Sequence, residues 1–346
     1  MLVEIREQML SGGGGEESAG VYRFSGTVRL DSQLQPWSVI AKLVHGKQTT
    51  RPNRAASSER EIRLYASGAL TGLPSPVRAP RIYALTEFSG DISCLWLEDL
   101  SGVTIDAWTL DDFDLAATNL GVFNGQYFGQ TAVLGKLTWS GGWLEQYLTQ
   151  ADGTFRQLPQ LMSFPLVRKT FPGRDLARLQ SVWERRHALL KRLETTSTVF
   201  CHLDANCRNV FFEKSLEGHK TLCLIDWAMS GPAPLGAELS SLVFGSVLLY
   251  GAEPSLLPEL RERVLAAYLS GLRQAGCDEP EPTVKDCFAV FSLLRYAAYH
   301  LVRLKVLCDE KSIAWAERVI GHSIESFIDR LVHIQDFLYR TLPKDC

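Results

Sequence analysis

Residues 200–227 read FCHLDANCRNVFFEKSLEGHKTLCLIDW, and the interpretation of the rest of the chain starts from them. A polar cluster within this stretch holds His202, Asp204 and Asn209, so that an acid stands five residues before an amide. Asp226 closes the stretch after a second apolar run. Carboxylate and amide oxygens suit Mg²⁺, which proteins hold through one or two carboxylates together with phosphate oxygens and water. The stretch therefore predicts phosphoryl transfer.

Two short β-prone runs, 210–212 and 222–225, flank a polar loop inside this stretch. Runs of this kind around a turn-rich loop are typical of a β-hairpin. A hairpin would bring Asn209 and Asp226 to the same end, where both could present an oxygen to one magnesium ion. The sequence therefore predicts a metal site at the open end of the hairpin.

The composition is that of a globular protein of ordinary charge, with 346 residues, 46% apolar, 22% charged and a net charge of −3. This length accommodates two domains or lobes, because single hydrophobic cores stop growing near roughly 250–300 residues. A nucleic-acid partner is not favoured, because such proteins usually show a basic stripe or a domain pI above about 9.

Membrane and secretion signals are not visible in the sequence. The longest mainly apolar run, 239–252, falls short of the roughly 18–20 residues that cross a bilayer. The first residues are charged and lack the apolar core of a signal peptide. The eight cysteines include no Cys-x-x-Cys pair, which argues against a zinc site or a disulfide framework. We expect a reduced, cytoplasmic enzyme with no membrane partner.

Residues 1–44 have the pattern of a β-meander, interrupted by a glycine run at 12–15. Glycine lets backbone N–H groups approach a phosphate closely, although a plain hairpin loop or linker explains the run as well. The strand pattern that follows places Lys42 among apolar residues, which an edge strand with one exposed lysine would also explain. A helical pattern at 59–70 carries Glu61, which could point back to Lys42 or be an ordinary solvated acid.

Strand patterns give way to helical ones near residue 99. Two strands, 82–85 and 92–97, precede the change. Helical patterns dominate the rest of the chain, at 110–127, 175–194, 256–275, 283–307 and 311–340. We expect a first lobe over residues 1–99 and a second lobe over residues 100–346.

Two segments of the second lobe have no helical period. Residues 128–175 predict either an insertion that binds the phosphate acceptor or plain packing. Residues 231–236, GPAPLG, predict a rigid loop ahead of another helix.

The combination of motifs resembles the aminoglycoside phosphotransferase and choline kinase-like branch of the protein-kinase-like fold. The motifs follow the order of that family and cover about residues 10–240. They are His202-Leu203-Asp204 with Asn209, Ile225-Asp226-Trp227 in place of D-F-G, Gly231 and Gly236 ahead of Glu238-Leu239, Lys42 in Val39-Ile40-Ala41-Lys42, Glu61 on its helix, and Leu97-Glu98-Asp99-Leu100 as a hinge. The resemblance implies an α+β, bilobal protein-kinase-like fold. Its first lobe would be a small antiparallel β N-lobe with one key helix, and its second a larger, mostly α-helical C-lobe.

The resemblance also implies catalytic and metal-binding roles. Asp204 would accept the proton of the acceptor hydroxyl or orient it, with His202 orienting the loop. Asn209 and Asp226 would hold Mg²⁺ between the β- and γ-phosphates of ATP. These roles fit phosphoryl transfer, which depends on positioning and charge neutralisation more than on covalent chemistry.

Nucleotide binding is implied for a further set of residues. Lys42 would contact the α- and β-phosphates, held by the carboxylate of Glu61. The complete set is Lys42, Glu61, the loop residues Gly13, Gly14 and Gly15, and the backbone of Glu98 and Leu100 at the hinge. ATP is the expected donor, while GTP remains open.

The sequence departs from the family pattern at two positions. Leu203 stands where many relatives have glycine, and Glu238 stands where they have aspartate. Neither change removes a catalytic group. Because the lysine, the glutamate, the base and both metal ligands are present, we expect an active enzyme.

The leading hypothesis is an ATP- and Mg²⁺-dependent O-phosphotransferase that acts on a small hydroxylated molecule, such as an aminoglycoside or amino sugar, another antibiotic or a choline-like compound. One alternative is a kinase for Ser or Thr hydroxyls of a peptide or protein, although only a dozen residues separate Asp226 from Glu238, too few for a long activation segment. Another alternative is a nucleotide-binding regulatory protein that transfers no phosphate. The oligomeric state stays open.

The sequence leaves the acceptor open between two kinds of site. A polycation would need carboxylates, for which the candidates are Asp278, Glu279, Glu281, Glu253, Asp309 and Glu310. A choline-like cation would need an aromatic cage. The candidates for the cage are Trp227, Tyr296, Tyr299 and Trp315. Solvated acids and core aromatics explain both sets equally well.

Overall fold

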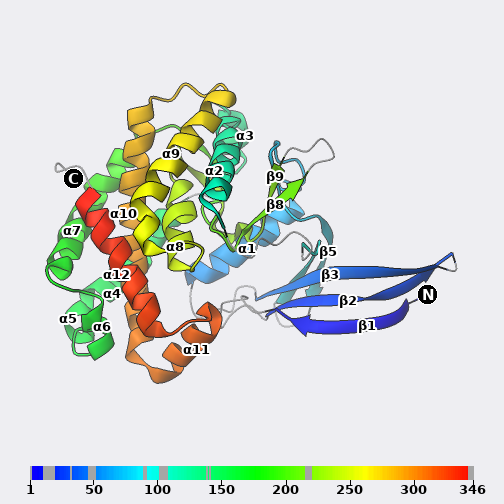
Figure 1. Cartoon of the computed structure of the whole chain (residues 1–346), viewed down its shortest axis with the longest axis horizontal. Helices are drawn as coiled ribbons and strands as arrows, with labels where there is room; N and C mark the ends of the chain where they lie inside the picture. The colour runs from blue at the N-terminus through cyan, green and yellow to red at the C-terminus, as the bar shows by residue number, and fades with distance from the viewer. Residues whose placement is uncertain are drawn as a thin grey trace. The chain divides into compact units, whose positions relative to one another are not determined.

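The computed structural model describes residues 2–10, 20–31, 33–45, 52–88, 92–100, 108–137, 139, 142–214 and 220–341. The chain divides into two compact units, drawn in Figure 1. The first unit comprises Met1–Leu73, Arg78–Ile105 and Phe211–Ala228, and the second Pro74–Val77, Asp106–Val210 and Met229–Cys346. The lobe boundary at residue 99 stays a prediction, and this division groups the segment that carries Asp226 with the first unit.

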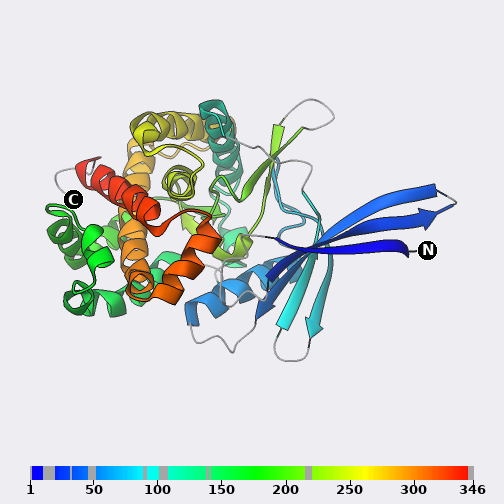
Figure 2. The same cartoon turned by 60° about the horizontal axis from the view of Figure 1, so that its bottom comes forward.

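A five-stranded antiparallel sheet lies in the first unit. Its strands, in spatial order, are β1 (Leu2–Met9), β2 (Gly20–Leu30), β3 (Gln33–His45), β6 (Ile92–Leu97) and β5 (Ile82–Phe88). Figure 2 shows the long strands β2 and β3 in blue, side by side. Lys42 in β3 is paired with Val21 on one side and Leu95 on the other. The alternative that Lys42 lies on an edge strand is therefore wrong.

Helix α1 (Pro52–Ala66) is the helix expected to carry Glu61. It packs against β3 and buries Leu64 and Tyr65 on its inner face. The helix begins seven residues before the predicted start at residue 59, where polar and small residues hide the pattern. It also ends earlier than predicted, just before Gly68, whose φ of +73° is a left-handed conformation that favours glycine.

A second, three-stranded sheet has the order β4 (Val77–Arg78), β9 (Lys220–Leu224) and β8 (Val210–Lys214). The hairpin predicted around residue 217 is confirmed, because β8 and β9 are neighbours in this sheet. Residues 222–224 of β9 are buried, so this strand contributes to the core that supports Asp226 two positions later.

The second unit is built mainly from helices. They are α2 (Leu110–Gly125), α3 (Thr131–Gly135), α4 (Trp143–Arg156), α5 (Leu158–Leu161), α6 (Pro165–Lys169), α7 (Asp175–Leu193), α8 (Ser246–Leu248), α9 (Leu257–Gln274), α10 (Glu281–Leu304), α11 (Glu310–Ile320) and α12 (Ile324–Thr341). The single helical run predicted at 311–340 is divided into α11 and α12, because Gly321 takes a left-handed conformation at the end of α11. Among the helices of the described chain, none is long and apolar enough to cross a membrane.

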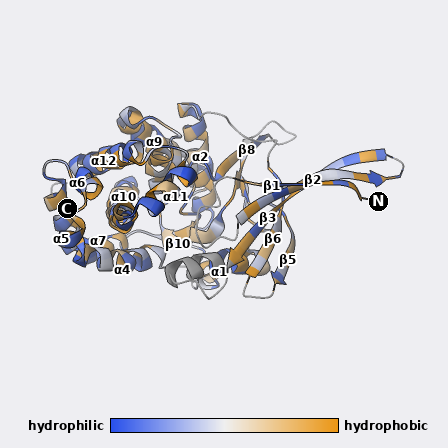
Figure 3. Cartoon of the chain, turned by 90° about the horizontal axis from the view of Figure 1, so that it is seen from below, coloured by the Kyte–Doolittle hydropathy of each residue, from blue (hydrophilic) through white to orange (hydrophobic). Residues whose placement is uncertain are grey.

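Helix α10 forms the centre of this unit and is seen nearly end-on in Figure 3. It packs against α4, α7 and α12, and its residues 290–298 carry side chains that are almost all buried. A separate close contact joins α2 and α9 through Gly121 and Gly271. A Cβ atom on Gly121 would lie 2.2 Å from the carbonyl oxygen of Tyr268, so only glycine permits this approach.

A two-stranded antiparallel sheet leads into the polar cluster at residues 202–209. Strand β7 (Thr198–Cys201) pairs with β10 (Gly231–Pro234), with Cys201 opposite Gly231. The rigid loop predicted at 231–236 is thus partly a strand. Proline lacks a backbone N–H and is depleted in strands, but an edge strand with a single neighbour tolerates it.

Candidate active site

The structure places the predicted site residues in both units. Lys42, Glu61, Glu98, Leu100 and Asp226 belong to the first unit, and His202, Asp204 and Asn209 to the second. Gly13, Gly14 and Gly15 of the predicted phosphate loop lie outside the described residues.

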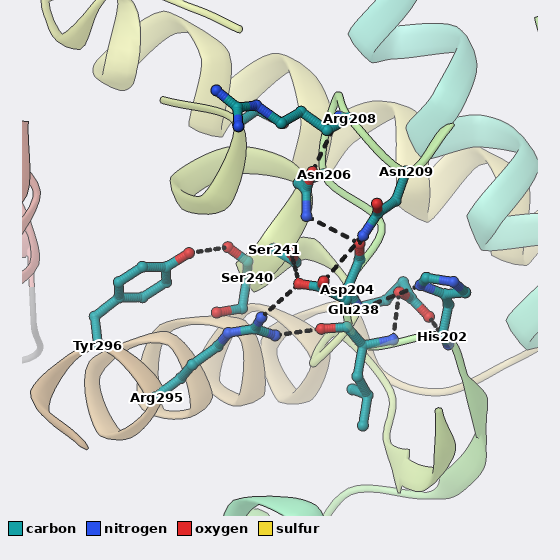
Figure 4. Close-up of polar contacts among 12 residues, drawn as sticks. His202, Asp204, Asn206, Arg208, Asn209, Glu238, Ser240, Ser241, Arg295 and Tyr296 are labelled. Carbon is teal, nitrogen blue, oxygen red and sulfur yellow. Dashed lines mark hydrogen bonds and ion pairs between the residues drawn. The ribbon is translucent and has the colours of Figure 1, made fainter. Parts of the chain in front are cut away.

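The loop after β7 holds Asp204 and Asn209 in direct contact, as Figure 4 shows. The Asn209 side-chain amide donates to Asp204 Oδ2 and to the Asp204 carbonyl oxygen, each at 2.9 Å. Ser241 Oγ donates to the other carboxylate oxygen, Oδ1, at 3.1 Å. Arg295 Nη2 donates to the same Oδ1 at 3.1 Å. Donors therefore fix both oxygens of the Asp204 carboxylate.

His202 is fully buried beneath this loop. Its Nδ1 accepts the backbone N–H of Asp204 at 3.2 Å, so the ring supports the backbone of the acid. Glu238 is also fully buried, and its carboxylate accepts the N–H groups of His202 at 2.6 Å and Leu203 at 2.9 Å. Burial raises the pKa of Glu238 to about 7, although these N–H groups act against the rise. Glu238 therefore anchors the backbone of this loop at two consecutive residues.

Leu203 has a φ of +63°. This left-handed conformation is uncommon for residues other than glycine, and it carries an energetic cost. The N–H of Leu203 donates to Glu238, and its carbonyl oxygen accepts from Arg295 Nη1. Hydrogen bonds on both sides of the residue thus hold this left-handed conformation.

The first unit brings Lys42 together with Glu61 and Asp226. Lys42 Nζ lies 2.6 Å from Glu61 Oε2 and 2.9 Å from Asp226 Oδ1. Burial opposes the lysine charge, but the carboxylates of Asp226 and Glu61 raise the pKa of Lys42 above its ordinary value. Burial raises the pKa of Glu61, and the ammonium group beside it acts in the opposite direction. Lys42 is therefore a cation held on two carboxylates, and Glu61 is no solvated surface acid.

The turn around Asp226 is anchored to helix α1 at two points. Asp226 has a φ of +62°, a strained conformation for a residue with a side chain. The N–H of Trp227 donates to Glu61 Oε1 at 3.2 Å, and Arg60 Nη1 donates to the carbonyl oxygen of Ala228 at 2.8 Å. Burial lowers the pKa of Arg60. Two consecutive residues of α1 thus fix the chain on the C-terminal side of Asp226.

A half-buried ionic cluster includes Glu98 of the predicted hinge. Arg78 Nη1 lies 2.7 Å from Glu98 Oε2, and its Nε donates to Glu213 Oε2 at 2.5 Å. The backbone N–H of Glu98 donates to the Arg81 carbonyl at 2.9 Å, so an adenine contact at this residue would fall to its carbonyl oxygen. The Glu98 side chain serves the hinge itself, and Leu100 is buried.

Four of the six acids considered for a polycationic acceptor have structural partners. Glu279 accepts from Ser197 Oγ at 2.6 Å, and Glu281 pairs with Lys285 at 2.6 Å along α10. A further two lie elsewhere: Asp309 caps the N-terminus of α11 through the N–H of Ser312, and Glu253 pairs with Arg330. These contacts favour the interpretation of these acids as structural.

The aromatic residues considered for a cage are likewise part of the packing. Trp227 is fully buried and donates its indole N–H to the Leu224 carbonyl at 2.7 Å. Tyr296 is buried in α10, with its ring 6.0 Å from that of Tyr299. Because neither side chain is accessible to a ligand cation, Trp227 and Tyr296 are excluded as members of an aromatic cage.

The donor set predicted for magnesium is chemically suitable. The described residues contain no group of three or more His, Cys, Asp or Glu side chains that could hold a metal ion. Asp226 is a carboxylate with 45% of its side chain exposed, and Asn209 offers an amide oxygen because its nitrogen is the donor to Asp204. One carboxylate and one amide fit a Mg²⁺ ion that keeps water and phosphate oxygens as its other ligands.

Three residues at the site were missed in the sequence. Arg295 and Ser241 contact Asp204 from 91 and 37 positions away, and Arg60 contacts the turn after Asp226 from 168 positions away. Arg295 lies in the apolar middle of α10, and an arginine among apolar residues was the signal that the sequence offered. No local spacing could have paired it with Asp204.

Solved structures with this fold include several phosphotransferases. A spectinomycin phosphotransferase, in complex with ADP and spectinomycin, aligns with a TM-score of 0.57 and 14% identity, over 98% of this chain and 95% of that one. Ethanolamine kinase of Plasmodium vivax aligns with a TM-score of 0.53 and 14% identity, over 96% and 81%. Aminoglycoside 2'-phosphotransferase-IIIa, in a GDP complex, aligns with a TM-score of 0.53 and 14% identity, over 95% and 93%. The predicted bilobal α+β, protein-kinase-like fold is confirmed.

Sequence comparison supplies the family. A search of curated proteins finds no significant match. The family model described as "Phosphotransferase enzyme family" matches residues 28–277, which is well over half of the chain and includes Lys42, Glu61, Asp204, Asn209 and Asp226. With the lysine–glutamate pair and the braced acid loop both in place, the chain belongs to the phosphotransferase enzyme family.

Proposed function

We propose that this enzyme is an ATP- and Mg²⁺-dependent O-phosphotransferase that moves the γ-phosphate to a hydroxyl of a small molecule. The observation that carries the proposal is the Asp204 carboxylate, which Asn209, Ser241 and Arg295 hold by both oxygens. A carboxylate held in one orientation is suited to align a hydroxyl, and alignment is the main demand of phosphoryl transfer.

Lys42 is proposed to bind the α- and β-phosphates of the nucleotide. Its ammonium is already held by Glu61 and Asp226, so the charge is positioned before the nucleotide arrives. Such a preorganised cation loses little freedom on binding. Solved relatives carry ADP, GDP or AMP-PNP with Ca²⁺, which supports nucleotide binding here and keeps both ATP and GTP as candidate donors.

Asp226 and Asn209 are the proposed ligands of the magnesium ion. When bound, the ion would neutralise charge on the β- and γ-phosphates. The anchoring of the Asp226 turn by Glu61 and Arg60 would keep this carboxylate oriented. The amide of Asn209 would serve twice, with its nitrogen on Asp204 and its oxygen toward the metal.

Asp204 is proposed to receive the proton of the acceptor hydroxyl as the bond to phosphorus forms. His202 contributes by supporting the Asp204 backbone through Nδ1. The glycine loop at Gly13, Gly14 and Gly15 and the hinge carbonyl of Glu98 complete the proposed nucleotide contacts.

The proposed acceptor is a small molecule and not a protein. The described chain between Asp226 and Glu238 forms β10 and tight turns, which leaves it too short for the long activation segment of protein kinases. The described cysteines are free thiols, as expected in a reducing compartment, so the proposal includes a cytoplasmic location.

A substitution of Asp204 tests the proposal most directly. We expect Asp204→Asn to lower kcat by about 10²- to 10⁴-fold, the range typical of a lost general base. Binding of Mg²⁺–ATP, measured by isothermal titration, should be retained because the amide keeps the shape of the side chain. Asp286→Asn is the matched control, since Asp286 pairs with Arg192 and belongs to no part of the site.

The acceptor is to be found by measuring ADP release from ATP with amino sugars, aminoglycosides, macrolides, choline, sugars and hydroxy amino acids. Phosphorylation of polypeptides in place of small molecules, seen by mass spectrometry, would replace the proposal with a protein kinase. Nucleotide binding without ADP formation from any acceptor would favour the regulatory alternative. Full turnover by Asp204→Asn would reject the mechanism.

A further inference from the structure

Arg295 is a buried cation in the apolar middle of α10, with 6% of its surface exposed. Its guanidinium donates through Nη1 to the carbonyl oxygen of Leu203 and through Nη2 to Asp204 Oδ1 at 3.1 Å. The face of the same guanidinium lies 4.9 Å from the ring centroid of Trp143 in α4. A buried arginine costs desolvation free energy, so these three contacts must compensate it.

The two hydrogen bonds act on consecutive residues of the catalytic loop. Leu203 has a left-handed backbone, and Asp204 carries the proposed catalytic carboxylate. Because the guanidinium is planar and rigid, one group that bonds both residues fixes the carboxylate relative to the backbone that carries it. A lysine has one charged centre and lacks this fork geometry.

The carboxylate has donors on both of its oxygens. Ser241 and Arg295 donate to Oδ1, while Asn209 donates to Oδ2. Removal of Arg295 would take a charged donor away from Oδ1 and would release the carbonyl oxygen of Leu203. Asn209 also donates to the Asp204 carbonyl oxygen from within the loop, whereas Arg295 ties the carboxylate to the strained backbone of Leu203 from helix α10.

We infer that Arg295 is a positioning residue for phosphoryl transfer: it holds the Asp204 carboxylate in the orientation that meets the acceptor hydroxyl. The inference rests on the proposed function, because it assigns Arg295 a task at the same acid. Arg295 touches neither the substrate nor the nucleotide in this assignment, and it acts through Asp204 alone.

Trp143 extends the arrangement to α4. Its ring stacks on Tyr147, one turn later, at a centroid distance of 5.1 Å and an interplanar angle of 22°. The indole face covers the guanidinium and restricts its movement, since a cation over an aromatic face is attracted to it. The segment 128–175, for which the sequence left an acceptor role open, thus contacts the catalytic acid through one intermediate residue.

Arg330 provides a matched control in the same unit. It is 7% exposed, donates to the carbonyl oxygens of Val247 and Ala252, pairs with Glu253 at 2.8 Å, and lies 4.2 Å from the ring centroid of Tyr250. Burial, carbonyl acceptors, a carboxylate and an aromatic ring are therefore the same as for Arg295. The difference is that its carboxylate partner is Glu253 and not Asp204.

The test compares Arg295→Met, Arg295→Lys and Arg330→Met in the full-length protein. Initial rates of ADP release from Mg²⁺–ATP are measured with the best acceptor of the screen, or with water as acceptor. We expect Arg295→Met to lower kcat on the order of 10- to 100-fold, the loss typical of a misplaced catalytic group, with the KM for Mg²⁺–ATP nearly unchanged. Arg295→Lys should have a kcat between those of Arg295→Met and the wild type. Arg330→Met should have the wild-type kcat when it is assayed below its own Tm.

A second measurement uses thermal unfolding of Asp204→Asn, Arg295→Met and the double variant. In the wild-type background, Arg295→Met leaves the Asp204 carboxylate without its cation. In the Asp204→Asn background there is no carboxylate to be left unpaired. The loss of Tm caused by Arg295→Met should therefore be smaller in the Asp204→Asn background. This cycle needs no acceptor and can be carried out with Arg295→Lys if Arg295→Met does not fold.

The outcomes separate the inference from the proposed function. A kcat of Arg295→Met that falls no further than that of Arg330→Met would overturn the inference and leave the phosphotransferase proposal standing. Absence of ADP release by the wild type with every acceptor and water would reject the proposed function. In that case the thermal unfolding cycle still tests the contact between Arg295 and Asp204. Equal Tm losses in both backgrounds would overturn the inference.

Discussion

Glu238 illustrates how a single buried side chain can stabilise the loop that carries Asp204 and make it sensitive to pH. Its two oxygens accept the N–H groups of His202 and Leu203, and burial raises its pKa from an ordinary 4.5 to about 7. Because the folded state binds the proton more tightly than the unfolded chain, the stabilising contribution of protonation is complete below about pH 4.5. It is lost as the pH rises through about 7.

Glu238→Gln should remove this part of the pH dependence. Glutamine cannot titrate, and its NH₂ group faces a backbone N–H in place of one oxygen, so we expect lower stability at every pH. Between pH 4.5 and 7, the free energy of unfolding should fall less steeply with pH than in the wild type, by up to about 1.4 kcal/mol per pH unit for one proton. Urea unfolding at several pH values measures both slopes, and equal slopes would contradict the assigned titration.

At the residue scale, the sequence predicted contacts that lie within a local pattern and missed those that do not. Asp204 and Asn209 are five positions apart in one loop, both were singled out from the sequence, and the structure brings them into contact. Arg295 and Arg60 reach their partners across long separations, and their charge in apolar surroundings does not specify a partner. The left-handed Leu203 was noted as a departure from the family, but its two compensating hydrogen bonds appear only in the fold.

At the scale of elements, α1 and the turn after β9 act as one structural group. Glu61 receives the Trp227 N–H and holds Lys42, while Arg60 donates to the Ala228 carbonyl. Two consecutive residues of one helix thus have different roles: Glu61 contacts Lys42, and Arg60 anchors the turn after β9. The resemblance of the motifs predicted the pairing of Glu61 with Lys42, whereas the N-terminal boundary of α1 was obscured by its polar first turns.

Arg60→Met should weaken binding of Mg²⁺–ATP while leaving the fold intact. Methionine preserves much of the buried volume but cannot donate to the Ala228 carbonyl, so the strained Asp226 turn loses one of its anchors. Loss of one such hydrogen bond costs ~1 kcal/mol, which corresponds to roughly a fivefold rise in Kd if the cost falls on the bound state. Isothermal titration measures Kd, and Arg63→Met, an exposed arginine on the same helix, is the control.

At the scale of the whole molecule, the proposed chemistry draws on both units. Asn209 precedes β8 in the second unit, and Asp226 follows β9 in the first, although they are separated by one hairpin. Lys42 and Glu61 also belong to the first unit, and Asp204 to the second. The two lobes followed from the order of strand and helix patterns, and the protein-kinase-like fold from the resemblance of the motifs. The assignment of the hairpin to the first unit depends on packing that no local pattern encodes.

Removal of the Asp226 carboxylate should separate nucleotide binding from metal binding. A ligand that binds the folded state stabilises it by about 2.7 kcal/mol at a concentration of 100 times Kd, so the wild type should unfold at a higher temperature with ATP and Mg²⁺ than with ATP alone. In Asp226→Ala we expect the increment due to Mg²⁺ to disappear, because the proposed carboxylate ligand is gone. Asp114→Ala is the control, since Asp114 is an ion-pair partner of Arg263 on the second unit. A Mg²⁺ increment that survives in Asp226→Ala would place the metal on other residues, and the roles proposed for Asp226 and Asn209 would have to be reassigned together.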